Sequence, residues 1–172
     1  MKHLKIILPL LAGLIIFSLL NHSFKTGLIL LILIAIASLS TFYYNYFHGP
    51  INFELIKIST IISTVAYGIA VGLLVAIFSS VLSRIWSGRF DHRVIISLVG
   101  VILMSISANV FREVNIICLG IILVAAYHIV TLPISIAAGD SYAFAIPYAV
   151  TNIFFNALLF IFAAQPLLAI IR

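Results

Sequence analysis

The acidic side chains and the histidines are the groups in this sequence that could perform acid–base chemistry or bind a metal. The chain has four acidic residues, Glu54, Asp91, Glu113 and Asp140, and no two have the spacing of a paired acid and base or of a metal site. No ligand spacing relates the five histidines, which are His3, His22, His48, His92 and His128. Phosphate-binding loops and nucleophile motifs are also absent from the sequence. We therefore expect no enzyme activity, no cofactor and no metal site.

Polar side chains within long apolar stretches are stronger candidates, because polarity inside a bilayer is costly and marks either helix contacts or a pathway. Glu54 and Lys57 stand three residues apart and share one helical face. They either contact a solute or form a gate at the mouth of a pocket, or they are an interfacial ion pair in which Lys57 extends to water.

A stripe of hydroxyl side chains follows this pair. Thr60, Thr64 and Tyr67 lie at positions i, i+4 and i+7, which places them on one face of a helix, with Ser59 and Ser63 beside them. The stripe either lines a polar pocket or forms hydrogen bonds with its own helix and with a neighbouring helix. The sequence favours neither alternative.

Later segments contribute a histidine and two asparagines. His128 lies in the middle of an apolar segment, and Asn152 and Asn156 are one helical turn apart on a shared face. An imidazole or an amide at this depth needs a partner, which is either another helix or a ligand. All three are therefore candidate solute contacts.

Small residues recur at every fourth position in the segment before Arg84. They are Gly68, Gly72, Ala76 and Ser80. Such a ladder lets two helix backbones approach closely and gain van der Waals contact that lipid does not offer. We expect it to pack against another helix of this chain or against a partner subunit.

The composition indicates a membrane protein. In this chain 65% of the residues are hydrophobic and 8% are charged, whereas roughly a quarter of the residues of a soluble domain are charged. The net charge of +5 is typical of basic loops in a membrane protein, and no nucleic-acid binding is expected. The lone cysteine, Cys118, is expected to be a small buried hydrophobe.

Seven apolar segments predict an all-α, multi-pass helix bundle in the cell membrane, with six to seven transmembrane segments in a single domain covering residues 1–172. The predicted segments are 4–20, 27–44, 55–67, 69–86, 94–111, 116–138 and 144–171. We interpret the first as a retained membrane helix rather than a secretory signal, because no small-residue cleavage pattern precedes Asn21.

Length arithmetic predicts a break near Tyr67 and Gly68. A single helix from Leu55 to Trp86 would be about 48 Å long at roughly 1.5 Å per residue, and the hydrocarbon core is about 30 Å thick. Two short helices that pack together fit better.

The basic residues then predict an orientation with the N-terminus in the cytoplasm and the C-terminus outside. In a seven-segment bundle the cytoplasmic ends would carry Lys2, Lys5, Lys57, Arg84, Arg89 and Arg93. The outer ends would carry only Lys25, Arg112 and Arg172, which satisfies the positive-inside rule.

Several motifs together resemble a known family. A loop ending in Ile51-Asn52-Phe53-Glu54-Leu55 leads into a short helix, and Tyr67-Gly68-Ile69-Ala70-Val71-Gly72 turns into a second helix that ends near Ser79-Ser80. The final helix reads Ile146-Pro147-Tyr148-Ala149-Val150-Thr151-Asn152-Ile153-Phe154-Phe155-Asn156. Across roughly residues 27–171 this order resembles the substrate-binding S component of energy-coupling-factor vitamin transporters, and it is similar to the rod-shape MreD family.

The resemblance implies a prokaryotic six-helix bundle that captures a vitamin-like solute in an outward pocket. It also implies contact between small residues and a coupling subunit driven by ATPases; the matching residues are Ala35, Ala37, Ser38 and Thr41. The family orientation would place Arg84, Arg89 and Arg93 outside, opposite to the orientation that the charge count predicts.

These observations predict a small-solute-binding component of a transporter that works with partner membrane subunits in the lipid bilayer. The alternative is a non-catalytic structural or accessory subunit of a membrane protein complex, in which the ladder is an interface and the hydroxyl stripe is a helix contact.

Overall fold

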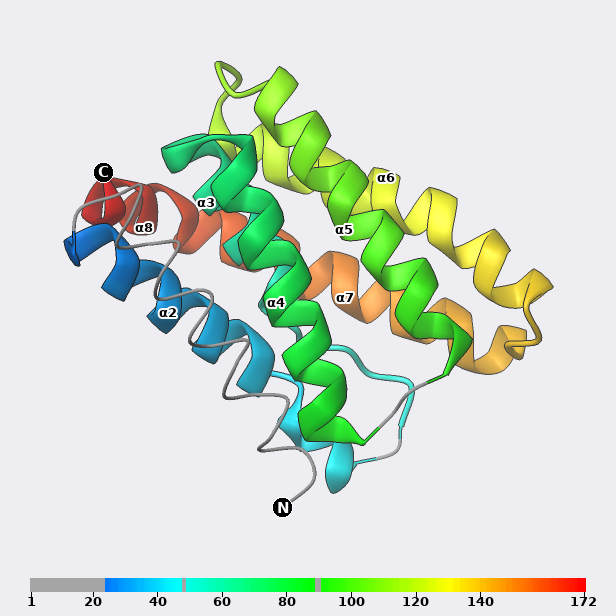
Figure 1. The fold of residues 1–172 in the computed structure, drawn as a ribbon. Helices are drawn as coiled ribbons and strands as arrows, with labels where there is room; N and C mark the ends of the chain where they lie inside the picture. The colour runs from blue at the N-terminus through cyan, green and yellow to red at the C-terminus, as the bar shows by residue number, and fades with distance from the viewer. Residues whose placement is uncertain (1–23, 48, 89–90) are drawn as a thin grey trace.

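The computed structural model describes residues 24–47, 49–88 and 91–172, and 83% of these residues are helical, with no strand among them. The helices are α2 (Phe24–Leu39), the short 3₁₀ helix η1 (Phe42–Asn45), α3 (Ile56–Tyr67), α4 (Ile69–Ser87), α5 (His92–Val110), α6 (Ile116–Ala137), α7 (Tyr142–Phe162) and α8 (Ala164–Ile171) (Figure 1). In the described residues, five helical stretches are long and apolar enough to cross a membrane. The chain therefore has the structure of a multi-pass membrane protein, and the predicted segment 4–20 lies outside the described residues.

The predicted break is confirmed at Gly68. Helix α3 ends at Tyr67, α4 begins at Ile69, and Gly68 between them has a φ of 90°, a conformation that residues with a Cβ rarely adopt. The two helices fold back on each other and make extensive contact. Since α3 has only 12 residues, it is about 18 Å long at roughly 1.5 Å per residue and covers little more than half of the hydrocarbon core.

The predicted final segment 144–171 is two helices rather than one. Helix α7 ends at Phe162 and α8 starts at Ala164, so that Pro166 falls in the first turn of α8. Proline has no N–H for the carbonyl four residues earlier, here that of Phe162, and its ring would clash with that carbonyl. The helix therefore breaks just before the point where Pro166 would interrupt it.

Hydrogen bonds between helices show which segments lie together at each end of the bundle. At the α8 end, the Tyr67 hydroxyl donates a hydrogen bond to the carbonyl of Ile171, so the turn at Gly68 lies beside the C-terminal helix (Figure 1). The opposite end contains Arg84 and Arg93, and we call it the arginine end. There, Asn45 Nδ2 of η1 donates to the carbonyl of Trp86 at 3.0 Å. The starts of α5 and α7 also lie at the arginine end, because each long helix crosses the bundle once.

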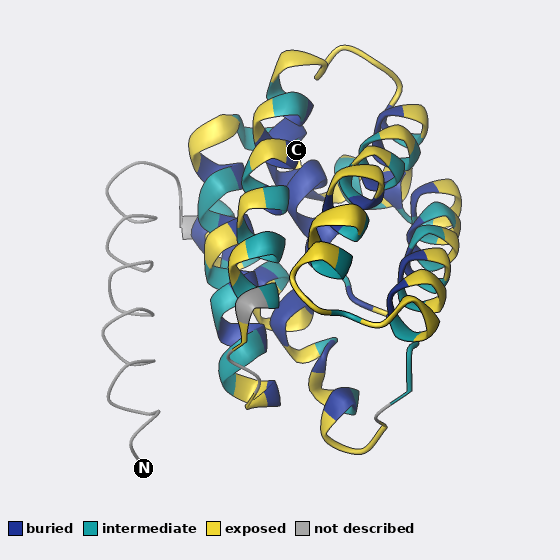
Figure 2. Ribbon diagram, turned by 90° about the vertical axis from the view of Figure 1, so that its right-hand side faces the viewer, coloured by how far each residue is buried: buried dark blue, intermediate teal, exposed yellow. Residues whose placement is uncertain are grey.

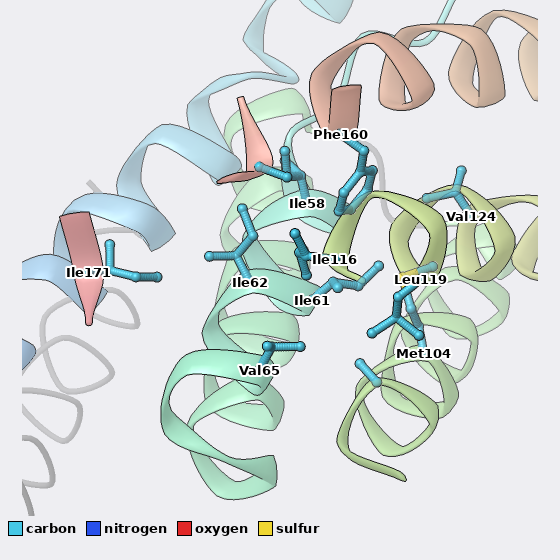
Figure 3. Close-up of a cluster of buried hydrophobic side chains, with 12 residues drawn as sticks. Ile58, Ile61, Ile62, Val65, Met104, Ile116, Leu119, Val124, Phe160 and Ile171 are labelled. Carbon is cyan, nitrogen blue, oxygen red and sulfur yellow. The ribbon is translucent and has the colours of Figure 1, made fainter. Parts of the chain in front are cut away.

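The main apolar core surrounds α3 near the α8 end (Figure 3). Ile61 and Ile62 of α3 pack in a cluster with Met104 of α5, Leu119 of α6 and Phe160 of α7. The outward faces of the long helices are exposed (Figure 2) and carry large aliphatic residues, which in a membrane face lipid. Since lipid is as apolar as these side chains, close packing rather than exclusion of water stabilises the core.

Three of the four ladder residues are buried inside the chain. Gly72 faces α3 and α5, Ala76 packs in a cluster with Ala37 and Val101, and Ser80 is also buried. The ladder therefore packs helices of this chain together, whereas Gly68 provides the backbone conformation of the turn.

The predicted number of basic residues at the cytoplasmic ends falls by one, because Lys57 is only 1% exposed and lies at neither end of the bundle surface. From Lys25 onward the other basic residues divide equally between the two ends by their sequence positions: Arg84, Arg89 and Arg93 at one, Lys25, Arg112 and Arg172 at the other. The predicted orientation therefore depends on Lys2 and Lys5, outside the described residues.

We predict that Gly72→Leu destabilises the bundle by about 1–3 kcal/mol, the usual cost of overpacking a well-packed core. A Cβ at this position would overlap Thr64 Oγ1 and lie 2.7 Å from Ser105 Oγ. The measurement is the midpoint of unfolding in detergent micelles. The matched control is Ala70→Leu, at an exposed position of the same helix, which should change stability by about 0.5 kcal/mol or less; equal midpoints for the two variants would contradict the packing role.

Candidate solute-binding site

The loop before α3 has no regular secondary structure, and side chains form hydrogen bonds with its backbone. The Tyr43 hydroxyl donates to the Ile51 carbonyl at 3.0 Å and accepts from the Phe53 N–H at 2.8 Å. The N–H of Asn52 donates to Thr151 Oγ1 at 3.2 Å, and the N–H of Leu55 donates to Ser40 Oγ at 2.9 Å. A non-helical backbone at membrane depth is stable only when it finds such partners inside the protein.

Glu54 of this loop and Lys57 in the first turn of α3 form an ion pair in the interior. Their relative exposures are 5% and 1%, and Lys57 Nζ bonds to Glu54 Oε1. Lys57 Nζ also lies 4.5 Å from the ring centroid of Tyr127, in cation–π geometry. The predicted ion pair is therefore confirmed, but Lys57 does not extend to water, because both side chains are buried.

His128 and Asn152 meet beside this pair, across α6 and α7. His128 Nε2 and Asn152 Oδ1 are 2.8 Å apart, and Asn156 Nδ2 donates to the Asn152 carbonyl at 3.0 Å. Both asparagines are fully buried. In the described part of the chain, Asn152 Nδ2 and Asn156 Oδ1 have no hydrogen-bond partner, so donor and acceptor capacity remains inside the bundle.

The hydroxyl stripe mainly makes helix contacts. Thr64 Oγ1 donates to the Thr60 carbonyl at 2.7 Å and lies 3.0 Å from Ser105 Oγ of α5, while Ser63 Oγ donates to the Ser59 carbonyl. Tyr67 is at the α8 end. Thr60 Oγ1 is buried without a described partner. None of Thr60, Thr64 and Tyr67 lines the pocket described next.

A pocket of about 80 Å³ lies in the half of the bundle nearer the arginine end. Helices α4 to α7, η1 and the turns before α5 and α7 form its wall. The charged lining residues are Arg84, Asp91, Arg93 and Asp140, and the other polar and aromatic ones include Tyr44, Ser97, Tyr127, His128, Thr131, Phe144 and Tyr148. One water molecule needs about 10–15 Å³ of such space, so the pocket can hold several waters or a small organic molecule. Of the predicted solute contacts, only His128 lines it directly, and Asn152 stands behind His128.

An ion pair at the arginine end closes one side of the pocket. Arg93 of α5 donates from Nε to Asp140 Oδ1 at 2.8 Å, and its guanidinium lies 5.3 Å from the ring centroid of Phe144. Asp91 caps α5 by accepting from the Arg93 N–H at 3.1 Å. These contacts hold the start of α5 against the turn between α6 and α7.

Sequence reasoning missed Tyr44, Arg84, Tyr127 and Tyr148 as wall residues. A signal existed for Tyr148, which precedes Asn152 by one helical turn and therefore shares its face. In the sequence, Arg84 indicates only the orientation in the membrane, and Tyr44 indicates only the end of an apolar segment. Cys118, predicted to be buried, is exposed on α6.

Comparison with protein-family models, with curated proteins and with solved structures finds no match for this chain.

The arrangement can bind and orient a small molecule. The histidine side chain is fixed by Asn152, tyrosine hydroxyls and rings line the wall, and the ion pairs of Lys57 and Arg93 hold charged groups in place. Among the described residues, no three His, Cys, Asp or Glu side chains are grouped so that they could hold a metal ion.

We predict that Glu54→Gln destabilises the fold by about 3–5 kcal/mol, because it leaves the Lys57 ammonium buried and uncompensated. The double variant Glu54→Gln with Lys57→Met should recover most of this loss, since replacing both charges removes the uncompensated one. Unfolding midpoints in detergent, compared in a double-mutant cycle, measure the effect. A double variant as unstable as Glu54→Gln alone would mean that the buried charge is not the cause.

Proposed function

We propose that this chain is the small-solute-binding component of a transporter in the cell membrane, that it crosses the membrane six to seven times, and that it works with partner subunits. The solute is vitamin-like in size and polarity. The observation that carries this proposal is the pocket between α4 and α7, whose inner wall contains His128 held by the buried amide of Asn152. A concave pocket with a few converging polar groups is the usual form of a ligand site.

Binding rather than catalysis is the role that these groups suit. The acidic side chains near the pocket are occupied: Asp140 pairs with Arg93, Glu54 pairs with Lys57, and Asp91 caps α5. A general acid or base, in contrast, must be free to exchange a proton with the reacting group. We therefore propose that the site captures its solute unchanged.

The resemblance to S components supports this role through the short helix hairpin at Gly68 and the pocket beside α7. The matching small residues of α2 fit less simply, because Ala37, Ser38 and Thr41 are buried within the bundle, and Thr41 Oγ1 lies 2.7 Å from Ser83 Oγ of α4. A partner subunit would therefore meet Ala35 and its exposed neighbours.

A structural or accessory subunit is the second candidate. The helix contacts of Thr64 and Ser63 favour it, since such bonds need no solute. This role would leave the pocket empty in the working complex.

Solute retention tests the proposal. Protein purified in detergent should release a small molecule that mass spectrometry detects, and Asn152→Leu should reduce the amount by about tenfold or more, because His128 loses its partner in the pocket wall. The matched control is Phe154→Leu, a 66% exposed position on the same helix, which should retain the solute. No small molecule in the wild-type extract, together with co-purifying large subunits, would favour the accessory role.

Capture from outside predicts that the arginine end of the bundle faces outward, as the family resemblance implies. In a Cys118→Ser background, Ser141→Cys should react with a membrane-impermeant maleimide in intact cells. The control, Glu113→Cys at the other end of α6, should react only after the cells are opened; both positions are exposed. The reverse labelling would confirm the orientation predicted from Lys2 and Lys5 and contradict uptake through this pocket.

A further inference from the structure

Arg84 is a charged wall residue of the pocket for which the proposed function gives no role. It lies in the last turn of α4, partly buried, and lines the pocket together with Tyr127 and Tyr148. Within the described residues, no carboxylate pairs with its guanidinium and no side-chain hydrogen bond engages it.

The other cations near the pocket are already neutralised. Arg93 pairs with Asp140, whose side chain is 6% exposed, and Lys57 pairs with Glu54 deeper in the bundle. Asp91, which also lines the pocket, is 39% exposed, caps α5 and lies 3.9 Å from Arg93 Nε, so water, the positive end of the helix and Arg93 compensate its charge. In the part of the chain that the structure describes, Arg84 is therefore the one cation of the wall without a carboxylate.

A guanidinium in such a wall strongly prefers an oxyanion as its partner. Arginine keeps its charge, and its planar fork of N–H donors matches the two oxygens of a carboxylate. The attraction is stronger in a cavity between helices than in water, because less solvent screens it.

The rest of the wall suits a flat, apolar body. The rings of Tyr127, Phe144 and Tyr148 and the side chains of Ile96 and Leu132 line the pocket. Phe144 and Tyr148 are stacked with ring centroids 6.1 Å apart, so they present a row of aromatic surface along α7. Aromatic surface of this kind packs favourably on planar ligands.

We propose that the solute is a small organic carboxylate with a planar apolar body, and that its carboxylate pairs with Arg84. This inference rests on the proposed function, because it names the chemical class of the molecule in the same pocket. The guanidinium of Arg84 can pair with one anionic group, and the carboxylates of Asp91 and Asp140 in the same wall disfavour a second one.

Benzoate and its neutral isostere benzamide test the charge requirement. In detergent, benzoate at millimolar concentration should raise the unfolding temperature of the wild type, and benzamide should not. Arg84→Gln should weaken benzoate binding by about tenfold or more, as expected when a charge-assisted hydrogen bond is lost. The matched control, Arg112→Gln, removes an exposed arginine at the other end of the bundle and should leave benzoate binding unchanged.

The solute retained by the purified protein provides a second measurement. It should be an anion that partitions into the aqueous phase, and it should be absent from Arg84→Gln and present in Arg112→Gln. An anionic lipid in the organic phase, lost on the same substitution, would overturn the assignment of a free carboxylate.

The two proposals fail in different ways. Equal stabilisation by benzamide and benzoate, undiminished in Arg84→Gln, would overturn the carboxylate and leave solute binding intact. A neutral or cationic solute retained by Arg84→Gln would do the same. If neither probe stabilises the wild type and no solute is retained, solute binding itself fails.

Discussion

The ion pair of Glu54 and Lys57 is buried inside the helix bundle, and the neighbouring side chains compensate both charges. An ammonium taken out of water needs a carboxylate at contact distance and further polar or aromatic neighbours; Lys57 has both Glu54 and the ring of Tyr127. Glu54 lies in the non-helical loop just before α3, and Lys57 lies in the first turn of that helix. That loop in turn depends on side chains such as Tyr43 and Thr151, which take the backbone hydrogen bonds that a helix would otherwise make.

The short length of α3 determines where the pocket lies. Helix α3 fills the half of the bundle near α8, where its aliphatic residues pack around Phe160 (Figure 3). No residue of α3 lines the pocket, whose wall comes from α4 to α7 and η1. The half of the bundle that α3 does not reach is filled instead by tyrosines, His128 and Arg84. The apolar core and the pocket are thus complementary results of one half-length helix.

The sequence is sufficient to predict the helices from α2 to α6 and the break at Gly68, because segment length and hydropathy are local properties, but it does not predict that the last segment divides into α7 and α8. It also identifies His128 and Asn152, since polar side chains in apolar segments are visible without a structure, although their contact across two helices is not. It fails for Lys57, because spacing along a helix does not reveal whether the preceding loop runs along the surface or into the bundle. It fails for Arg84 for a related reason: a basic residue at a segment end is the same signal whether it faces lipid headgroups or a cavity.

The charged side chains in and around the pocket differ in whether another charged group pairs with them. A buried ion pair contributes little to stability compared with apolar residues of the same shape, so the pairs of Lys57 and Arg93 are not needed to make these helices pack. Both pairs instead border the pocket region, one behind Tyr127 and one beside Phe144, and both leave their surroundings neutral. Among the described residues of the wall, Arg84 is the cation that no carboxylate contacts, because Asp91 and Asp140 both lie beside Arg93. Only the Lys57 pair is fully buried, since the side chain of Arg93 is 38% exposed, and together the two pairs leave Arg84 as the cation of the wall that can attract an anion.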